Sequence, residues 1–251
     1  MTRLLSILLL ACTLSTFAQS EAEWIKKADA AEAALNESGA FEAFKQAIRI
    51  NPNNFYAQWK SSELCSRLGK RQPTKDQQQA FYNAGKTYAS NAIRINPAAA
   101  DGYYAMAVAM GRLALTQSGR ERIKSVKDIR SYAEKAIRIN PRHGRSWHVL
   151  GKWHYEVTNL GFFEKAGLKI IYGGLPPASL QESIQCYEKA KQFEPIFALN
   201  YLELAKAYRR NDQKDKAIEL LRKLPSIQNK TADDAHIKSE GAKLLKELLE
   251  D

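Results

Sequence analysis

The chain has 251 residues and a formal net charge of +11. Its three cysteines are too few for a disulfide framework, so a fold of this size must be stabilised by packing. The length is enough to bury a sizeable core in one elongated domain. The excess of basic charge favours an acidic partner, which could be nucleic acid, an anionic lipid surface or an acidic peptide.

Residues 1–18 have the pattern of a cleaved export signal. A short start containing Arg3 precedes the aliphatic run Leu4 to Ala11, and Thr16 and Ala18 are small residues suited to a signal peptidase. The apolar run is shorter than the about 20 residues that a spanning helix needs. We therefore predict cleavage before Gln19 and one domain over residues 19–251.

An alternative is a lipoprotein signal, because the four residues ending at Cys12 loosely resemble a lipobox. Ordinary cleavage would give a periplasmic or secreted protein without a transmembrane segment, whereas the alternative would give a protein anchored to the membrane through Cys12. Export argues against a nucleic-acid partner in either case.

One phrase recurs along the mature chain. It is Ala-Ile-Arg-Ile-Asn-Pro at 47–52, 92–97 and 136–141, and only its frame remains at 190–195. Apolar residues three or four apart, followed by a proline that cannot continue a helix, mark the end of a helix. Spacings of 45, 44 and 54 residues between the prolines indicate a repeat architecture.

The residues after each proline are typical of tetratricopeptide repeats, in which a large and a small residue let two antiparallel helices touch. Gly151 and Ala205 are the expected small residues, whereas the first repeat departs from the pattern at Ser61 and Ser62. The predicted fold is all-α, a tetratricopeptide-type solenoid of helix pairs. Longer helix pairs around 69–73 and 118–125 are expected to take up part of the extra spacing.

The rest of the extra spacing is an apolar insert, Val157 to Ala178, interrupted by glycines and prolines. It is expected to contain a short helix from Phe162 to Tyr172, and Ser179 with Glu182 resembles a capping box for the next helix. A segment this apolar must be covered, and burial against the repeats is favoured over a ligand held near Phe162 and Phe163.

The sequence carries no signature of catalysis. It has no G-x-S-x-G, H-E-x-x-H, P-loop or C-x-x-C motif. His148 and His154 are six residues apart, so they lie on different faces of a helix and do not converge with His143 on a metal. Cys65 and Cys186 could pair, but burial as two small apolar residues is favoured. We predict no enzyme activity, cofactor or metal.

Helices at the first position of each repeat line the concave side of such a solenoid. The repeat frame places a set of basic and aromatic residues there: Tyr104, Arg112, Arg145, His148, Lys152, Tyr155, Lys206 and Arg209. The basic charge is concentrated in this part of the chain, because eleven basic and three acidic residues lie between 111 and 152. Charges on a solvated helix face are the simpler interpretation. A site for an acidic chain end or a phosphate head group is the functional one.

From Phe55 to Leu249 the chain resembles the regulator of microtubule dynamics family. The resemblance is most specific over residues 150–157, continues through the insert to Pro176-Pro177, and extends into 181–184, 187–190 and 200–202. It implies a scaffold of tetratricopeptide type, whose animal members are associated with microtubules or hold phospholipid at a membrane contact. The export signal departs from that setting and suggests a bacterial protein.

An adaptor is the favoured function, and three alternatives remain open: a lipid-binding protein, a structural subunit, and an enzyme whose site would have to consist of unfamiliar residues. The adaptor would be non-catalytic and would bind an acidic peptide or protein in the concave groove. The lipid-binding protein would belong to the cell envelope and bind or transfer phospholipid, with the apolar insert covering acyl chains. A structural subunit of an envelope complex would show neither kind of small ligand.

Overall fold

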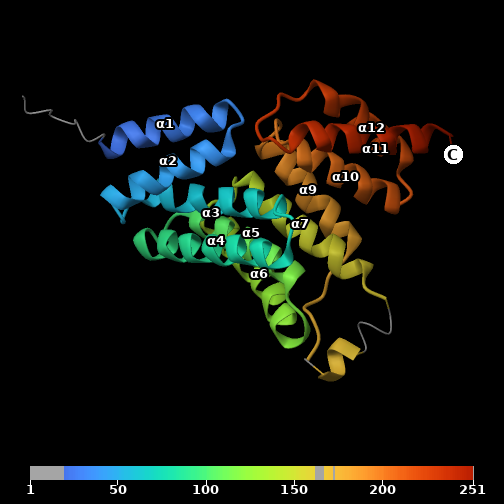
Figure 1. Cartoon of the computed structure of the whole chain (residues 1–251). Coiled ribbons are helices and arrows are strands. Elements are labelled where there is room, and N and C mark those ends of the chain that lie inside the picture. Colours follow the sequence, from blue (N-terminus) through green and yellow to red (C-terminus); the bar gives the residue numbers. More distant parts are fainter. Residues whose placement is uncertain (1–19, 162–166, 172, 251) are drawn as a thin grey trace, which may run out of the picture.

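The computed structural model describes residues 20–161, 167–171 and 173–250, and within them the regular structure is entirely helical. The predicted all-α fold is confirmed (Figure 1). The predicted signal segment 1–18 and the insert residues Phe162 and Phe163 lie outside the described residues. The elements are α1 (Glu21–Ala33), α2 (Glu37–Ile50), α3 (Phe55–Lys70), α4 (Lys75–Ile95), α5 (Ala100–Thr116), α6 (Gly119–Ile139), α7 (Gly144–Asn159), α9 (Leu180–Phe193), α10 (Ala198–Arg210), α11 (Lys214–Lys223), η1 (Leu224–Ser226) and α12 (Asp234–Glu250).

The repeated phrase ends a helix wherever it occurs, as predicted. Asn51, Asn96 and Asn140 are the C-caps of α2, α4 and α6. Each asparagine also accepts, through its side-chain oxygen, a hydrogen bond from the backbone N–H two residues later, at 3.0, 3.1 and 3.0 Å respectively. This local bond turns the chain after the helix, which explains why the phrase has asparagine before its proline.

The helices form antiparallel pairs: α1 with α2, α3 with α4, α5 with α6, α7 with α9, and α10 with α11 (Figure 1). α12 packs against the last pair. The extra spacing in the middle of the chain lies in α4 and α6, which have 21 residues each. The predicted lengthening of these two pairs is therefore confirmed.

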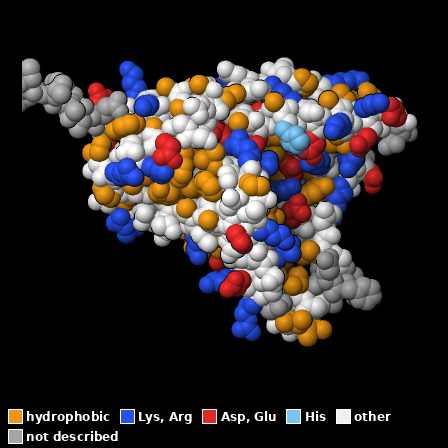
Figure 2. All heavy atoms as spheres, viewed as in Figure 1, with side chains coloured by type: hydrophobic (Ala, Val, Ile, Leu, Met, Phe, Trp, Pro, Cys, Tyr) orange, Lys and Arg blue, Asp and Glu red, His pale blue; other side chains and the backbone are white. Residues whose placement is uncertain are grey.

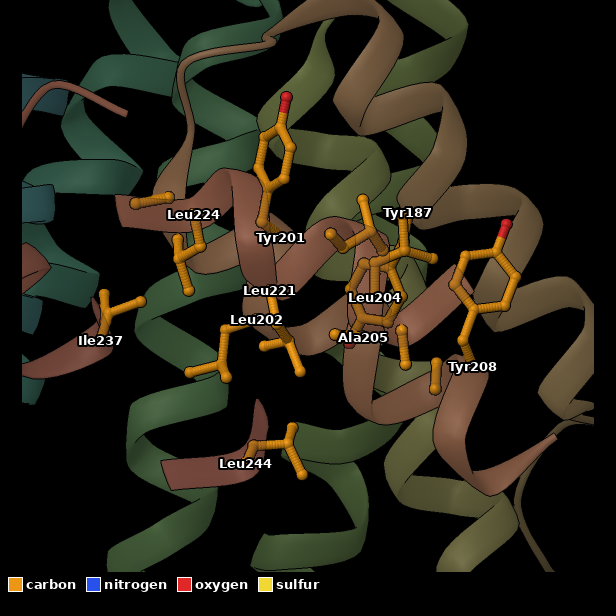
Figure 3. Packing of buried hydrophobic residues seen from close by; sticks show 14 of the residues in the cluster. Tyr187, Tyr201, Leu202, Leu204, Ala205, Tyr208, Leu221, Leu224, Ile237 and Leu244 are labelled. Carbon is orange, nitrogen blue, oxygen red and sulfur yellow. The ribbon is translucent and has the colours of Figure 1, made fainter. Parts of the chain in front are cut away.

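Small residues allow the paired helices to approach closely. A β-carbon added at Gly151 of α7 would lie 2.9 Å from the ring of Tyr187 on α9. Ala205 has no exposed surface and belongs to the largest apolar cluster, which joins α9, α10, α11 and α12 (Figure 3). The predicted close contact at Gly151 is confirmed, and Ala205 is buried between helices.

The α3–α4 pair also needs small residues where its helices touch, but it uses different ones. Ser61 and Ser62 are fully buried, and a β-carbon at Gly85 of α4 would lie 3.2 Å from Cys65 Cβ and 3.3 Å from the Ser62 carbonyl oxygen. Here serines on one helix and a glycine on the other leave room for the contact. The departure at Ser61 and Ser62 is thus a change of packing partners within a normal helix pair.

The described residues in the middle of the insert differ from the expectation that the repeats bury it. Residues 167–171 are helical, in agreement with the short helix predicted there, but the side chains of Ile170 and Ile171 are 85% and 65% exposed. Figure 1 shows this segment projecting away from the helix pairs. The reason is connectivity: the glycines and prolines around it allow no long helix that could lie along α7 or α9.

The end of the insert is ordered by the next helix. Ser179 is the N-cap of α9 and accepts a hydrogen bond from the Glu182 N–H at 3.0 Å, as predicted. The reciprocal half of a capping box is replaced by a hydrogen bond from the Ser179 hydroxyl to the Glu182 carboxylate.

In the part of the chain that the structure describes, no helix combines the length and apolar character needed to cross a bilayer.

Candidate functional site on the inner face

The inner face is the side of the solenoid formed by α3, α5, α7, α10 and α12. Side chains from successive members of this row meet there. The Tyr104 hydroxyl on α5 donates to Glu63 on α3 at 2.8 Å. Lys152 on α7 lies 2.7 Å from Glu203 on α10, and Lys206 on α10 lies 2.7 Å from Glu240 on α12. The inner face is therefore organised by bonds between helices.

A buried ion cluster holds α3, α5 and α7 together; it comprises Glu63, Tyr104, Arg145 and Glu194. Arg145 donates to Glu63 at 3.3 Å and to Glu194 at 2.8 Å. Burial alone would raise the pKa of Glu63, but Arg145, Arg67 and Lys60 outweigh it and lower that pKa to about 2. Glu63 is thus ionised at neutral pH although it is almost inaccessible to solvent.

His148 belongs to the interior next to this cluster. Its Nδ1 lies 2.9 Å from the side-chain oxygen of Asn200, and its ring packs against Tyr187 and Phe197. Burial lowers the pKa of His148 to about 4, so the ring is neutral at physiological pH. Tyr104 and His148 are both at least nine-tenths buried, and they support the inner face from behind.

A lysine cluster joins α7, α10 and α12; it comprises Lys152, Lys206 and Glu203, with Glu156 and Glu240 at its rim. Glu203 is 6% exposed and accepts from Lys152 at 2.7 Å and from Lys206 at 3.1 Å. Burial alone would raise the pKa of Glu203, but the two lysines hold it below its usual range. One buried carboxylate thus orients two cations from α7 and α10.

The rim of the lysine cluster is accessible to solvent. Glu156 pairs with Lys152 at 2.8 Å and Glu240 pairs with Lys206 at 2.7 Å, and these two glutamate side chains are 55% and 45% exposed. One turn farther along α10, Arg209 pairs with Glu247 of α12 at 3.2 Å, and both side chains are exposed. Exposed pairs of this kind contribute little to stability, because water solvates the separated charges almost as well.

The last two predicted residues differ in position. Tyr155 packs at the edge of the largest apolar cluster and has two cations near its ring centre, the Lys152 ammonium at 5.6 Å and the Arg210 guanidinium at 5.2 Å. Arg112 lies toward α4, where its charge opposes the rise in the pKa of Tyr82 that burial causes. The structure therefore places Tyr155 beside Lys152, brings Arg145, Lys152, Lys206 and Arg209 to the same face as buried Tyr104 and His148, and leaves Arg112 apart.

The charge of the inner face differs from the sequence expectation. The predicted cations on α7 and α10 lie against carboxylates that were not predicted, and Figure 2 shows acidic and basic side chains interspersed on the visible surface. Glu156 and Glu203 could have been found, because they lie four and three residues from Lys152 and Lys206 on the same helices. Glu63 and Glu240 belong to other helices and Glu194 is the C-cap of α9, so no local pattern points to them.

No group of histidines, cysteines and carboxylates among the described residues could hold a metal. His143 caps α7 by accepting from the Ser146 N–H at 3.2 Å, and the Nδ1 of His154 lies 3.2 Å from the Glu182 carboxylate, while burial lowers the pKa of His154. Cys65 and Cys186 are both buried and unpaired, as favoured from the sequence.

Two surface hollows lie away from the inner-face cations. One of about 380 Å³ lies between α9, α10 and α11 and includes Ile184, Glu188 and Tyr208. The other, of about 330 Å³, lies where the α1–α2 turn meets the end of α3 and includes Glu37 and Arg71. Neither is lined by a residue of the predicted groove.

Comparison with known families and proteins extends the resemblance to almost the whole chain. The model of the family described as regulator of microtubule dynamics protein 1-3 matches residues 24–249. Regulator of microtubule dynamics protein 1 of Bos taurus is 25% identical over 217 residues, which are 84% of this chain and 68% of that protein. Protein 3 of Xenopus laevis is 26% identical over 205 residues, 78% of this chain and 44% of that protein. The chain thus spans less than half of the frog protein.

Solved structures show the same architecture. A thermophilic TPR protein of Thermus thermophilus superposes with a TM-score of 0.68 at 17% identity, covering 90% of this chain and all of that chain. Yeast Tom70 superposes with a TM-score of 0.55 at 13% identity, covering 92% of this chain and 40% of that chain. These similarities establish the tetratricopeptide-type solenoid, a fold that presents an extended concave surface for binding.

Proposed function

The chain belongs to the regulator of microtubule dynamics protein 1-3 family, and from that premise we propose that it is a non-catalytic adaptor which binds an acidic segment of a partner protein on its inner face. The binding residues are Lys152, Lys206 and Arg209. Arg145, His148 and Tyr104 act from behind as structural support, because their polar groups are already bonded to buried partners.

The observation that supports this proposal is the different exposure of the carboxylates around the lysines. Glu203 is buried and fixes the positions of Lys152 and Lys206, whereas Glu156 and Glu240 bind the same ammonium groups from the solvent side. A partner carboxylate can replace an exposed glutamate at little cost, because the pair that is broken contributes only about 0.2–1 kcal/mol. The lysines are already held in place, so binding does not have to order them.

The test measures binding of a fluorescent glutamate-rich peptide by anisotropy, with a glutamine-rich peptide as the uncharged control. Lys152→Gln and Lys206→Gln should each weaken binding by about fivefold, equivalent to about 1 kcal/mol. Glu156→Gln and Glu240→Gln should strengthen it, because the competing internal carboxylates are gone. Rising salt should weaken binding in every variant that still binds.

Neutral glutamine replaces charge reversal in this test for a structural reason. Reversal of Lys152 and Lys206 to glutamate would place new carboxylates beside buried Glu203. Loss of binding could then reflect unfolding. Equal binding by wild type and all four glutamine variants would overturn the proposal, as would equal binding of the two peptides.

The exposed insert favours a second candidate function, contact with an anionic lipid surface. Ile170 and Ile171 are 85% and 65% exposed, and Lys169 beside them is exposed as well. Apolar side chains next to a cation suit the boundary between head groups and acyl chains. Figure 1 shows the segment projecting from the helix pairs, and Figure 2 shows hydrophobic side chains at that end of the molecule.

Sedimentation with vesicles tests this second candidate. Wild type should sediment with vesicles rich in phosphatidylserine and less with neutral phosphatidylcholine vesicles. Ile170→Glu together with Ile171→Glu should abolish sedimentation, whereas Ile196→Glu, at an isoleucine that is 51% exposed between α9 and α10, should not. Sedimentation that is equal in all three proteins would exclude the insert as the contact.

We also propose that the protein acts outside the cytoplasm, in the periplasm or in secreted form, on the basis of the signal pattern in residues 1–18. Mass analysis of the mature N-terminus tests this proposal. A first residue of Gln19 would support it, a diacylated Cys12 would indicate a membrane-anchored lipoprotein, and a retained Met1 would contradict export.

A further inference from the structure

The two ends of the solenoid touch each other. The Ala232 N–H, just before α12, donates to Glu37 in the first turn of α2 at 3.2 Å. Asp233 lies 3.4 Å from the ammonium of Lys70 and 4.0 Å from the guanidinium of Arg71, at the end of α3. These contacts join residues separated by more than 160 positions, across the side where α2 and the loop before α12 come close (Figure 1).

Both sides of this contact are organised in advance. Asp234 accepts hydrogen bonds from the N–H groups of Lys230 and Thr231 at 2.6 and 2.9 Å, which fixes the turn that presents Ala232 and Asp233. On the other side, Glu37 is buried and is already paired with Arg67 and Arg71. The turn fixed by Asp234 thus meets a set of ion pairs that Glu37 already forms with Arg67 and Arg71.

We propose that this contact is an electrostatic latch, formed by Glu37, Lys70, Arg71, Ala232 and Asp233, which holds the two ends of the solenoid together and opens without unfolding. α12 is anchored independently of the latch, because Ile237, Leu244 and Leu248 pack into the cluster with α10 and α11. Each helix pair also packs on its sequence neighbours, so separating the ends breaks no pair.

The latch is weak enough to respond to its surroundings. Lys70 and Arg71 are partly exposed, and the hollow of about 330 Å³ beside Glu37 and Arg71 admits water and ions. At physiological salt the screening length is about 8 Å, so added salt weakens exposed charge pairs. Opening would widen access to the inner face, and this consequence rests on the proposed adaptor function. The latch itself does not depend on it.

Distances between two spin labels test the latch in the protein without any ligand. The labels are placed at Ala34→Cys, in the α1–α2 turn, and at Gln228→Cys, in the loop before α12; both sites are exposed. Cys65 and Cys186 do not interfere, because burial raises the pKa of each thiol to about 12 and leaves it unreactive, and Cys12 is replaced by serine. Pulsed electron paramagnetic resonance then gives the distribution of distances between the ends.

At low salt the wild type should give one narrow distribution. Asp233→Lys should move it to longer distances and broaden it, and high salt should do the same to the wild type. The pair Lys70→Glu with Asp233→Lys should return it toward the wild-type value. Glu219→Lys, the same charge change at an exposed site on α11, should leave it unchanged.

Circular dichroism and melting of each variant separate opening from unfolding, and small-angle X-ray scattering of the unlabelled proteins gives an independent radius of gyration. A distribution and radius that are the same in wild type and Asp233→Lys at both salt concentrations would overturn the latch. Because no partner or peptide is present, that result would leave the test of the adaptor function unaffected.

Discussion

The buried ion cluster and the lysine cluster lie on the same face and share α7, yet they use charge in different ways. In the buried ion cluster Glu63 is almost inaccessible and bonds to Tyr104 and Arg145. Removing one member therefore leaves the polar groups of the others without a partner. In the lysine cluster only Glu203 is buried, and each lysine has a second, exposed carboxylate. The comparison teaches that pairs made by a buried carboxylate are structural, whereas pairs made by an exposed carboxylate, such as Glu156 and Glu240, are available to a partner.

The strongest test of this comparison removes the buried charge. Glu63→Gln should lower the free energy of unfolding by about 3–5 kcal/mol, because it leaves Arg145 and its neighbours without their anion. Urea unfolding followed by circular dichroism measures the change. Glu156→Gln in the lysine cluster is the matched control and should cost less than about 0.5 kcal/mol. Equal losses in the two variants would mean that burial does not distinguish the clusters.

A second test disturbs the helix that carries members of both clusters. Gly151→Leu should cost about 1–3 kcal/mol, because a β-carbon there already lies 2.9 Å from the Tyr187 ring and the larger side chain forces α7 from α9. Gly111→Ala on α5 is the control, since its β-carbon would meet only Ile129 Cδ1 at 3.9 Å. Thermal melting should show a lower midpoint for the first variant alone.

Acid should remove the contribution of Glu63 and so reduce the difference between the clusters. The pKa of this carboxyl is lowered to about 2 in the folded state, so the stability it contributes is present above its unfolded pKa of about 4.5. That stability is lost as the pH falls from about 4.5 to about 2. Melting midpoints of wild type and Glu63→Gln should therefore converge over this range, and a constant difference would contradict the assignment.

The smallest effect is expected at the most exposed pair of the inner face. Arg209→Gln breaks only the pair with Glu247, in which both side chains are exposed, and should change the free energy of unfolding by less than about 0.5 kcal/mol. It should still weaken binding of the glutamate-rich peptide, because Arg209 is one of the three proposed binding residues. A loss of stability comparable to that of Glu63→Gln would place Arg209 among the structural charges.

Local patterns in the sequence predicted the parts of the fold that depend on local chemistry. The Asn-Pro phrase predicted the helix ends, because asparagine and proline act on the backbone within a few residues. Gly151 predicted a close helix pair, because a small side chain on the packing face of a helix lets its neighbour approach.

The carboxylates that decide the character of the site could not be predicted in the same way. Arg145 meets Glu63 across 82 positions, and Lys206 meets Glu240 on a helix outside the repeat frame. Such pairs depend on how the whole solenoid curves, and a short stretch of sequence carries no information about that curvature. The exposure of Ile170 and Ile171 was also not predicted. Their hydrophobicity favoured burial, but whether a helix lies over them depends on the arrangement of the whole fold.

The contact between Glu37 and Ala232 also changes how the ends of the molecule fray. In an open array of repeats each unit touches only its neighbours, so the first and last helices detach independently. A bond that spans 195 positions links the two ends of the array. Detaching α2 therefore removes support from the turn before α12, and detaching that turn removes support from α2. Amide hydrogens at the two ends should therefore exchange with correlated protection, although they are the most distant in sequence.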